Sequence, residues 1–317
     1  MHTTTRSTRG AVTLGLLLGA AALAAPGKHA PPKKPLPVVR AEPSTTHPAA
    51  LSRYPAQLPL AEKVEGEQKH KNALVRDVTF AGLDASDRMR AYVVQPAGRG
   101  PYAGLLYVHW LGDPETTNRK QFLDDAVVMA SQGVVSVLVD AMWSEPGWYA
   151  KRTYETDYER SVQQVQRLRR ALDLLVAQPG VDPKRIGFVG HDFGAMYGAL
   201  MGAVDGRPRA YVFMAANPHF STWYMLGKRQ PKDPDAYVKQ MSVLDPTRYL
   251  PELSPAPVFF QFATKDRYVS AKEADEIYAS AGEPKLERRY PTDHGLELKR
   301  GAQDRFQWLQ RQLELRR

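Results

Sequence analysis

The 317-residue sequence contains no cysteine, which excludes a disulfide framework, a thiolate metal site and a cysteine nucleophile. Its eight histidines do not show the spacing of zinc ligands, so we expect no metal. The glycine-rich motifs that cradle phosphates in nucleotide-binding proteins are also missing. The sequence therefore indicates a protein that works without a cofactor.

Positive charge is scarce outside the first part of the chain. The formal net charge is +9, and residues 1–60 contribute +6 of it. The rest of the chain has a net charge of only +3. Because nucleic-acid binding needs cations clustered on the folded domain, we expect no nucleic-acid partner.

The first 60 residues divide into two segments. Arg6 and Arg9 precede an uncharged, Ala- and Leu-rich stretch that is shorter than the ~20 residues of a membrane span. This pattern predicts a cleaved signal peptide over residues 1–25, with an uncleaved membrane anchor as the alternative. Residues 26–60 carry nine prolines and are predicted to be a disordered linker. We therefore expect a secreted or periplasmic protein with no stable membrane span after cleavage, and a folded domain over residues 61–317.

Residues 61–317 alternate short β-rich runs with amphipathic helical patterns, which is typical of α/β architecture. The third to seventh runs are almost continuously apolar, as in parallel strands covered on both faces. Helices are predicted over 119–131, 159–178, 195–203, 271–281 and 303–315. The predicted strands span 73–80, 88–95, 104–110, 134–140, 186–190, 210–215, 258–263 and 286–290.

A strand-to-helix junction follows the fifth predicted strand. There, Gly190 and Gly194 flank Asp192 at −2 and +2. This is the pattern of a nucleophile elbow, in which the central residue occupies a strained turn and any Cβ at the flanking positions would collide with neighbouring backbone. The following helix directs its N-terminal amides toward the same point.

The elbow, its place after strand five and the later motifs resemble the α/β-hydrolase superfamily over residues 70–315. The phrase Gln-Pro-Gly-Val-Asp-Pro-Lys-Arg-Ile at 178–186 resembles its dienelactone hydrolase-like branch. That resemblance implies an eight-stranded, mostly parallel sheet with helices on both faces. Only about 40 residues, 217–257, separate strands six and seven, so any cap is small or absent.

Asp192 stands where dienelactone hydrolases have serine or cysteine. Gly-His-Asp-aromatic-Gly is instead similar to the elbows of epoxide hydrolases and haloalkane dehalogenases. A carboxylate needs no base to activate it, and its attack on a saturated carbon forms an ordinary ester. Attack on an ester carbonyl would form a high-energy mixed anhydride. The aspartate therefore favours an epoxide or halide substrate.

The resemblance also implies the other catalytic groups. The loop after the last strand of this fold carries the base, here His294, and the loop after strand seven carries the acid, here Asp266, which would orient the imidazole. Asp293 is the alternative acid. The oxyanion donors are expected to be the amide of Phe193 and that of Trp110 or Leu111.

Aromatic loops at the same edge of the sheet are predicted to line the pocket, since ligands bind there in open α/β sheets. We expect Trp143, Trp223, Tyr224 and His191 to contact a small-molecule substrate, with Tyr224 or Tyr149 as a donor to an epoxide oxygen. Packing of these aromatics within their loops is the alternative for each residue.

Three functions stay open at this point. The first is a hydrolase with an Asp nucleophile. The second is an esterase or lactonase in which Asp192 is a general base, and the third is a non-catalytic binding protein on the hydrolase fold. The sequence carries no signal for an oligomeric state.

Overall fold

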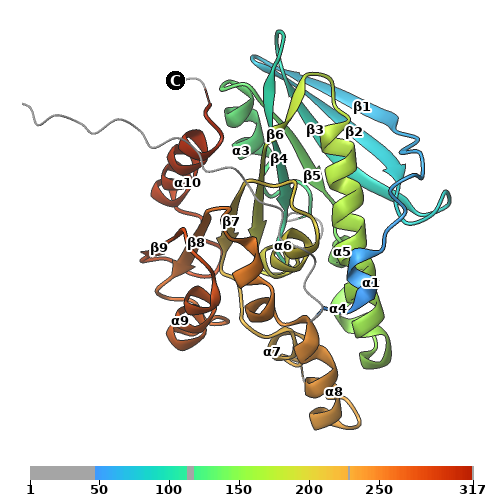
Figure 1. Cartoon of the computed structure of the whole chain (residues 1–317), viewed down its shortest axis with the longest axis vertical. Helices are drawn as coiled ribbons and strands as arrows, with labels where there is room; N and C mark the ends of the chain where they lie inside the picture. Colours follow the sequence, from blue (N-terminus) through green and yellow to red (C-terminus); the bar gives the residue numbers. More distant parts are fainter. Residues whose placement is uncertain (1–46, 113–117, 228, 316–317) are drawn as a thin grey trace, which may run out of the picture. The chain divides into compact units, whose positions relative to one another are not determined.

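One twisted mixed sheet organises the part of the chain that the computed structural model describes, residues 47–112, 118–227 and 229–315. Its nine strands follow the order β1-β2-β3-β5-β4-β6-β7-β8-β9, and β4 to β9 run parallel to one another. Figure 1 shows the sheet running through the molecule with helices packed against it. The predicted signal peptide and linker residues 26–46 lie outside the described residues. The strands are β1 (Lys63–His70), β2 (Ala73–Ala81), β3 (Arg88–Pro96), β4 (Tyr102–Val108), β5 (Val134–Val139), β6 (Val181–His191), β7 (Ala210–Met214), β8 (Val258–Ala263) and β9 (Lys285–Tyr290).

All eight predicted strands are present, and the structure adds β1 at one edge. The sequence does not predict β1, because seven of its eight residues are exposed and no apolar alternation marks it. The central strands β4 and β5 are buried along their whole length, as their apolar runs predicted.

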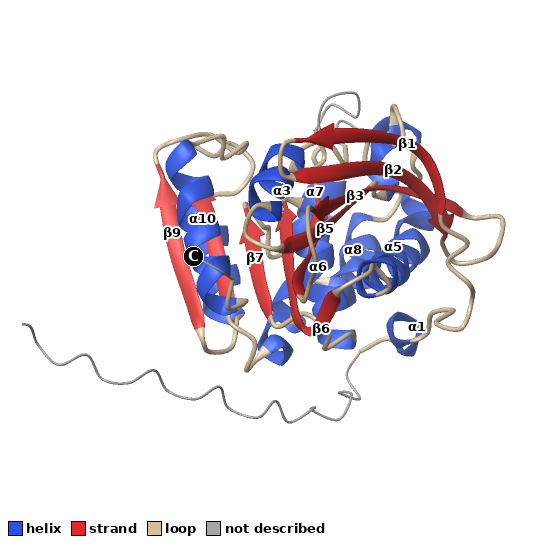
Figure 2. Cartoon of the chain, turned by 90° about the horizontal axis from the view of Figure 1, so that it is seen from above, coloured by secondary structure: helices blue, strands red, loops and turns tan. Residues whose placement is uncertain are grey.

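Helices cover both faces of the sheet, which Figure 2 shows from above. One face packs against α5 and α6, and the other packs against α3 and α10. The predicted apolar stripe of α5, from Val162 to Leu175, is buried. The helices are α1 (Ala49–Ser52), α3 (Leu123–Ala130), α4 (Trp148–Lys151), α5 (Tyr154–Val176), α6 (Phe193–Val204), α7 (Phe220–Tyr224), α8 (Pro234–Met241), α9 (Ala271–Ser280) and α10 (Lys299–Gln312), with short 3-10 segments η1 (Met142–Ser144), η2 (Ser242–Leu244), η3 (Pro246–Arg248) and η4 (Leu250–Leu253).

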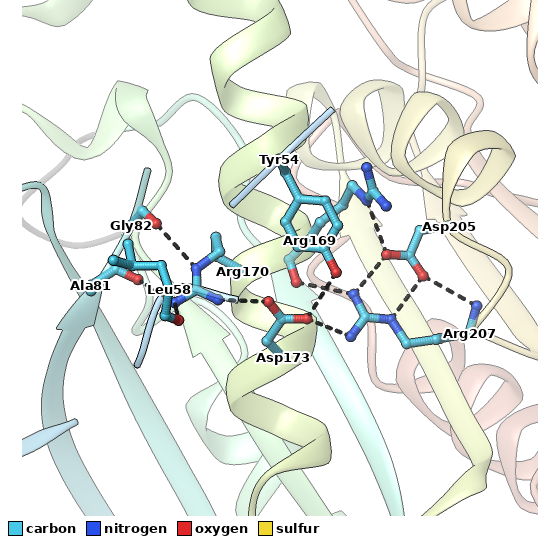
Figure 3. Close-up of polar contacts among 9 residues, drawn as sticks. All are labelled: Tyr54, Leu58, Ala81, Gly82, Arg169, Arg170, Asp173, Asp205 and Arg207. Carbon is cyan, nitrogen blue, oxygen red and sulfur yellow. Dashed lines mark hydrogen bonds and ion pairs between the residues drawn. The ribbon is translucent and has the colours of Figure 1, made fainter. Parts of the chain in front are cut away.

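Residues 47–60 depart from the predicted disordered linker, because they pack against α5. Leu51 is completely buried. The guanidinium of Arg169 lies over the ring of Tyr54, 3.7 Å from its centroid. Arg170 donates to the main-chain oxygen of Leu58 at 2.8 Å, and Figure 3 shows these contacts together. The folded part of the chain therefore includes residues that a proline count assigned to the linker.

The segment between β7 and β8 is a small cap made of α7, α8 and the three 3-10 segments η2 to η4. It takes the place of the large helical cap that the elbow sequence would otherwise suggest. Among the described residues, no helix combines the length and the apolarity that a membrane crossing requires.

Candidate active site

The junction between β6 and α6 is a tight elbow centred on Asp192. This residue has φ 55° and ψ −118°, a strained conformation for a side chain with a Cβ. A Cβ on Gly190 would lie 2.5 Å from the carbonyl of Gly194, and one on Gly194 would lie 2.2 Å from the main-chain oxygen of Val108. The two glycines are therefore required by the close approach of α6 to its own strand and to β4.

The carboxylate of Asp192 is buried at the N-terminus of α6. Its Oδ2 accepts a hydrogen bond from the main-chain N–H of Leu111 at 3.1 Å, whereas Oδ1 is buried without a partner in the described structure. Burial raises the pKa of Asp192, and His294 together with the amides of Leu111 and Phe193 partly opposes that rise. One oxygen is thus held by the backbone, and the other has no hydrogen-bond partner among the described residues.

His294, in the loop after β9, lies between two carboxylates. Its Nδ1 is 2.8 Å from Oδ2 of Asp266, and its Nε2 is 3.9 Å from Oδ2 of Asp192. Burial lowers the pKa of an imidazole, but the two carboxylates outweigh this effect and raise the pKa of His294 to about 9. The imidazole is therefore cationic at neutral pH.

Asp266 is held in place by its own loop after β8. Its Oδ1 accepts the main-chain N–H groups of Tyr268 at 2.8 Å and Val269 at 3.0 Å, which leaves Oδ2 for His294. Burial raises the pKa of this carboxyl, but His294 and the two amides outweigh burial and lower it. Asp293, the alternative acid, is exposed at the rim of the site.

The amide donors differ in part from the expectation. Leu111 donates to Asp192, and the amide of Phe193 also stabilises the charged carboxylate. The amide of Trp110 is not available to a substrate, because it donates to Oε1 of Gln121 at 2.9 Å. Trp110 is therefore corrected from an oxyanion donor to a residue whose ring lines the site.

Asp192 and His294 lie in a cavity of about 890 Å³ at the carboxyl edge of the parallel strands. Of the aromatic residues expected there, Trp223 lines it, as does Tyr149, whose hydroxyl donates to the main-chain oxygen of Trp223 at 2.8 Å. The cavity is lined by Trp110, Leu111, Gly112, Tyr149, Asp192, Trp223, Leu226, Gly227, Lys265, Arg267, Tyr268, Asp293, His294, Gly295 and Glu297.

Three residues predicted to contact substrate lie elsewhere. Trp143 is 1% exposed, because η1 turns inward and packs this indole against Phe193 and Tyr197. Tyr224 is completely buried, and its hydroxyl is 2.5 Å from that of Tyr197. His191 is also completely buried, on the far side of the Trp110 ring. Packing within the protein, the alternative interpretation, is correct for Trp143 and Tyr224, and His191, at the end of β6, is buried as well.

Several cavity residues were not anticipated. Tyr268 lies two positions after Asp266 and is 53% exposed beside Trp223, so its place in the acid loop was a usable signal. Lys265 and Arg267 flank the acid in the same loop. Gln121 is not marked by any motif, and only the tertiary structure brings it to the site. Among the described residues, no group of acidic and histidine side chains is arranged to hold a metal ion.

No protein-family model and no curated protein matches the chain. Among solved structures it is similar to acetyl xylan esterase 1 from Thermoanaerobacterium sp. JW/SL YS485, at 15% identity and a TM-score of 0.66 over 84% of this chain and 91% of that one. It is also similar to an acetyl xylan esterase from Paenibacillus sp. R4, at 17% identity and a TM-score of 0.68 over 83% and 92%. A third similar structure is 2,6-dihydroxy-pseudo-oxynicotine hydrolase, at 16% identity and a TM-score of 0.57 over 76% of this chain and 68% of that one. With its sheet order, this likeness shows that the chain has the α/β-hydrolase fold.

Proposed function

We propose that this chain of α/β-hydrolase fold is a hydrolase that attacks a saturated carbon bearing a halide-type leaving group, through a covalent ester on Asp192. The observation that carries the proposal is the asymmetric carboxylate of Asp192. Its Oδ2 is held by the amide of Leu111, its Oδ1 is buried without a partner among the described residues, and the residue itself lines the cavity. In the first step, Oδ1 forms a bond to carbon as the carbon–halogen bond breaks, and the halide leaves with the electron pair.

The second step hydrolyses the ester. His294 takes a proton from water, and the water oxygen attacks Cγ of Asp192. The negative charge that develops on Oδ2 is stabilised by the amide of Leu111, and the amide of Phe193 also favours the charged form of this side chain. Collapse of this intermediate releases the alcohol, which receives the proton from His294, and the carboxyl of Asp192 then loses its proton to solvent.

The same two carboxylates that keep His294 protonated supply a switch between the steps. Esterification removes the charge of Asp192, one of the two groups that raise the pKa of His294. That pKa then falls, the imidazolium releases its Nε2 proton to solvent, and the neutral imidazole becomes a base only after the ester has formed. Asp266, 2.8 Å from Nδ1, stabilises the imidazolium in the second step.

The hydroxyl and indole groups favour a halide over an epoxide. Opening an epoxide needs an acid, and the two hydroxyls predicted for that role are engaged elsewhere: that of Tyr149 donates to the main-chain oxygen of Trp223, and that of Tyr224 is buried against Tyr197. In contrast, Trp110 and Trp223 both line the cavity, and each indole N–H is buried without a partner among the described residues. Two such donors are suited to solvating a departing halide.

Ester or lactone hydrolysis is the second candidate, with Asp192 as a general base. It is supported by the acetyl xylan esterases of similar fold and by the dienelactone hydrolase-like phrase at 178–186. A non-catalytic binding protein is the third candidate. The ion pair of His294 with Asp266 favours the two catalytic candidates over it, since binding alone requires no oriented imidazole.

Single turnover in ¹⁸O-water with a panel of haloalkanes, haloacids, epoxides and p-nitrophenyl esters separates the candidates. We expect halide release, with label in the carboxylate of Asp192. In a His294→Phe variant, intact-mass measurement should detect an accumulated alkyl-enzyme. Adding Asp192→Asn to this variant should abolish the adduct. Adding Asp235→Asn, which changes an exposed carboxylate on α8, should not. Ester turnover without label at Asp192 supports the second candidate, and no turnover of any substrate supports the third.

We also propose that the protein is secreted or periplasmic after removal of residues 1–25. The support is the basic, then apolar, then small-residue pattern of that segment. N-terminal sequencing of the protein exported from a bacterial host tests it. A mature N-terminus near residue 26 agrees with the proposal, and an intact Met1 contradicts it.

A further inference from the structure

The side chain of Gln121 connects two catalytic loops that are far apart in sequence. Its Oε1 accepts the main-chain N–H of Trp110 at 2.9 Å, and its Nε2 is 2.6 Å from Nδ1 of His191. The other ring nitrogen of His191 is 2.9 Å from the main-chain oxygen of His294. One chain of hydrogen bonds therefore runs from the loop after β4 to the loop after β9.

The direction of every bond in this chain is determined by its two ends. The main-chain N–H of Trp110 is a donor, so the amide oxygen of Gln121 must face it and the amide nitrogen must face His191. Nδ1 of His191 then accepts, and Nε2 carries the hydrogen that it donates to the carbonyl of His294. The imidazole of His191 is thus neutral and in the Nε2–H form.

The surroundings of His191 favour the same neutral form. The ring is completely buried and stacks on Trp110, with centroids 5.0 Å apart and planes 5° apart. Burial, together with the nearby cationic His294, Arg305 and the His109 imidazole, places the pKa of His191 well below its ordinary value, although the carbonyl of His294 partly opposes them. A protonated ring would also direct Nδ1–H against the amide nitrogen of Gln121.

We infer that Gln121 and His191 are positioning residues. They fix the loop after β4, which carries the amide of Leu111, relative to the loop after β9, which carries His294, so that both loops face Asp192. Leu111, whose amide contacts the carboxylate, follows the Trp110 residue that Gln121 binds. His294, whose imidazole faces the same carboxylate, is the residue whose carbonyl His191 binds. Gln121 also accepts the hydrogen bond of the Trp110 amide, which leaves the amides of Leu111 and Phe193 as the oxyanion donors. The kinetic consequence rests on the proposed function, whereas the tautomer and the loop positions do not.

Imidazole ¹⁵N chemical shifts, measured by NMR on the full chain at neutral pH, test the inference without any substrate. In the wild type we expect His191 in the neutral Nε2–H form. The isosteric Gln121→Glu still accepts from Trp110 but sets a second oxygen against Nδ1 of His191, which should then become protonated. Gln240→Glu, the same change at an exposed position of α8, should leave His191 unchanged.

Gln121→Met tests positioning without adding charge. Loss of both bonds should lower the NMR titration midpoint of His294, because its loop is no longer held against Asp192 and Asp266. With a halide substrate, kcat should fall by about 10²-fold in either Gln121 variant, with a much smaller change in KM.

The inference is overturned if the ¹⁵N chemical shifts show that His191 in the wild type is either the neutral Nδ1–H tautomer or the cation. It is equally overturned if both Gln121 variants keep the wild-type midpoint of His294. Failure of the proposed function is a separate result, since it would show as absent turnover in a wild-type protein whose His191 tautomer and His294 midpoint still respond to Gln121.

Discussion

Nε2 of His294 lies 3.9 Å from Oδ2 of Asp192, while Nδ1 of the same ring is 2.8 Å from Asp266. The first separation is an ion pair without a direct hydrogen bond, and the second is a short charge-assisted hydrogen bond. An imidazole between two buried carboxylates is held as a cation, and its charge depends on whether Asp192 is ionised. Most of the chemistry proposed for this chain follows from that dependence.

The first prediction concerns the titration of His294. Its pKa should be about 9 in the wild type and should fall in Asp192→Asn, because the substitution removes one of the two charges that raise it. NMR titration of the imidazole measures both values. An unchanged midpoint in Asp192→Asn would show that Asp192 does not act on the base.

Stability should depend on pH through the same group. The folded pKa of about 9 is above the ordinary value of 6.5, so His294 stabilises the fold fully below pH 6.5 and progressively less as the pH rises through 9. We predict that the wild type loses, relative to His294→Gln, on the order of 3 kcal/mol of unfolding free energy over that window. Denaturant titrations at pH 6 and pH 9.5 measure the difference, and a difference that is equal at both pH values contradicts it.

Asp266→Asn should lower kcat by about 10³- to 10⁴-fold with little change in fold, since the amide cannot stabilise the imidazolium. Steady-state kinetics and circular dichroism measure the two quantities. Asp235→Asn, on the exposed face of α8, is the matched control. If kcat of Asp266→Asn stays within a few-fold of the wild-type value, Asp293 is the acid that orients His294.

Gly190→Ala should destabilise the fold by about 3 kcal/mol, because the new Cβ would lie 2.5 Å from backbone atoms of Gly194 that cannot move without displacing α6. Gly206→Ala is the control, since no atom lies within 4 Å of the added Cβ. Chemical denaturation of both variants measures the effect. Equal midpoints would mean that the elbow accommodates a side chain.

Arg152 should stabilise the fold through a buried ion pair. Its guanidinium, 2% exposed, pairs with Asp157, lies over the rings of Tyr149 and Tyr154 and donates to the main-chain oxygen of Tyr224 at the end of α7. Arg152→Met leaves the carboxylate of Asp157 buried without this cation, which should cost about 3–5 kcal/mol of unfolding free energy. The double variant Arg152→Met/Asp157→Leu should recover part of the loss. No recovery would show that the ion pair is not the source of the effect.

The secondary structure of this chain was largely readable from the sequence. Apolar runs predicted β4 and β5, and the three-to-four spacing from Val162 to Leu175 predicted α5. The exposed strand β1 and the packed segment 47–60 were missed. The segment 47–60 is held by partners distant in sequence, such as Arg169, whose guanidinium lies over the ring of Tyr54. Strand β1 is an exposed edge strand that carries no apolar alternation and is held by its pairing with β2. Local composition does not report such pairings.

The candidate site divides in the same way. The elbow glycines and the chain order of Asp192, Asp266 and His294 were visible in the sequence, because each follows the end of a predicted strand. Which aromatic rings reach the cavity was not visible, since a ring on a short helical segment can border the cavity, as that of Trp223 does, or pack in the core, as that of Trp143 does.

By itself, the sequence determined the alternation of strands and helices and the position of a carboxylate at the elbow, because both are written in local patterns of apolar residues and glycine. Only the tertiary structure decided that Gln121 occupies the amide of Trp110 and that His191 supports the base loop from behind. The physical reason is that His191 is 70 positions from Gln121 and 103 from His294, so their hydrogen bonds depend on how the sheet brings these segments together, and Gln121 is oriented toward Trp110 by the same chain of bonds.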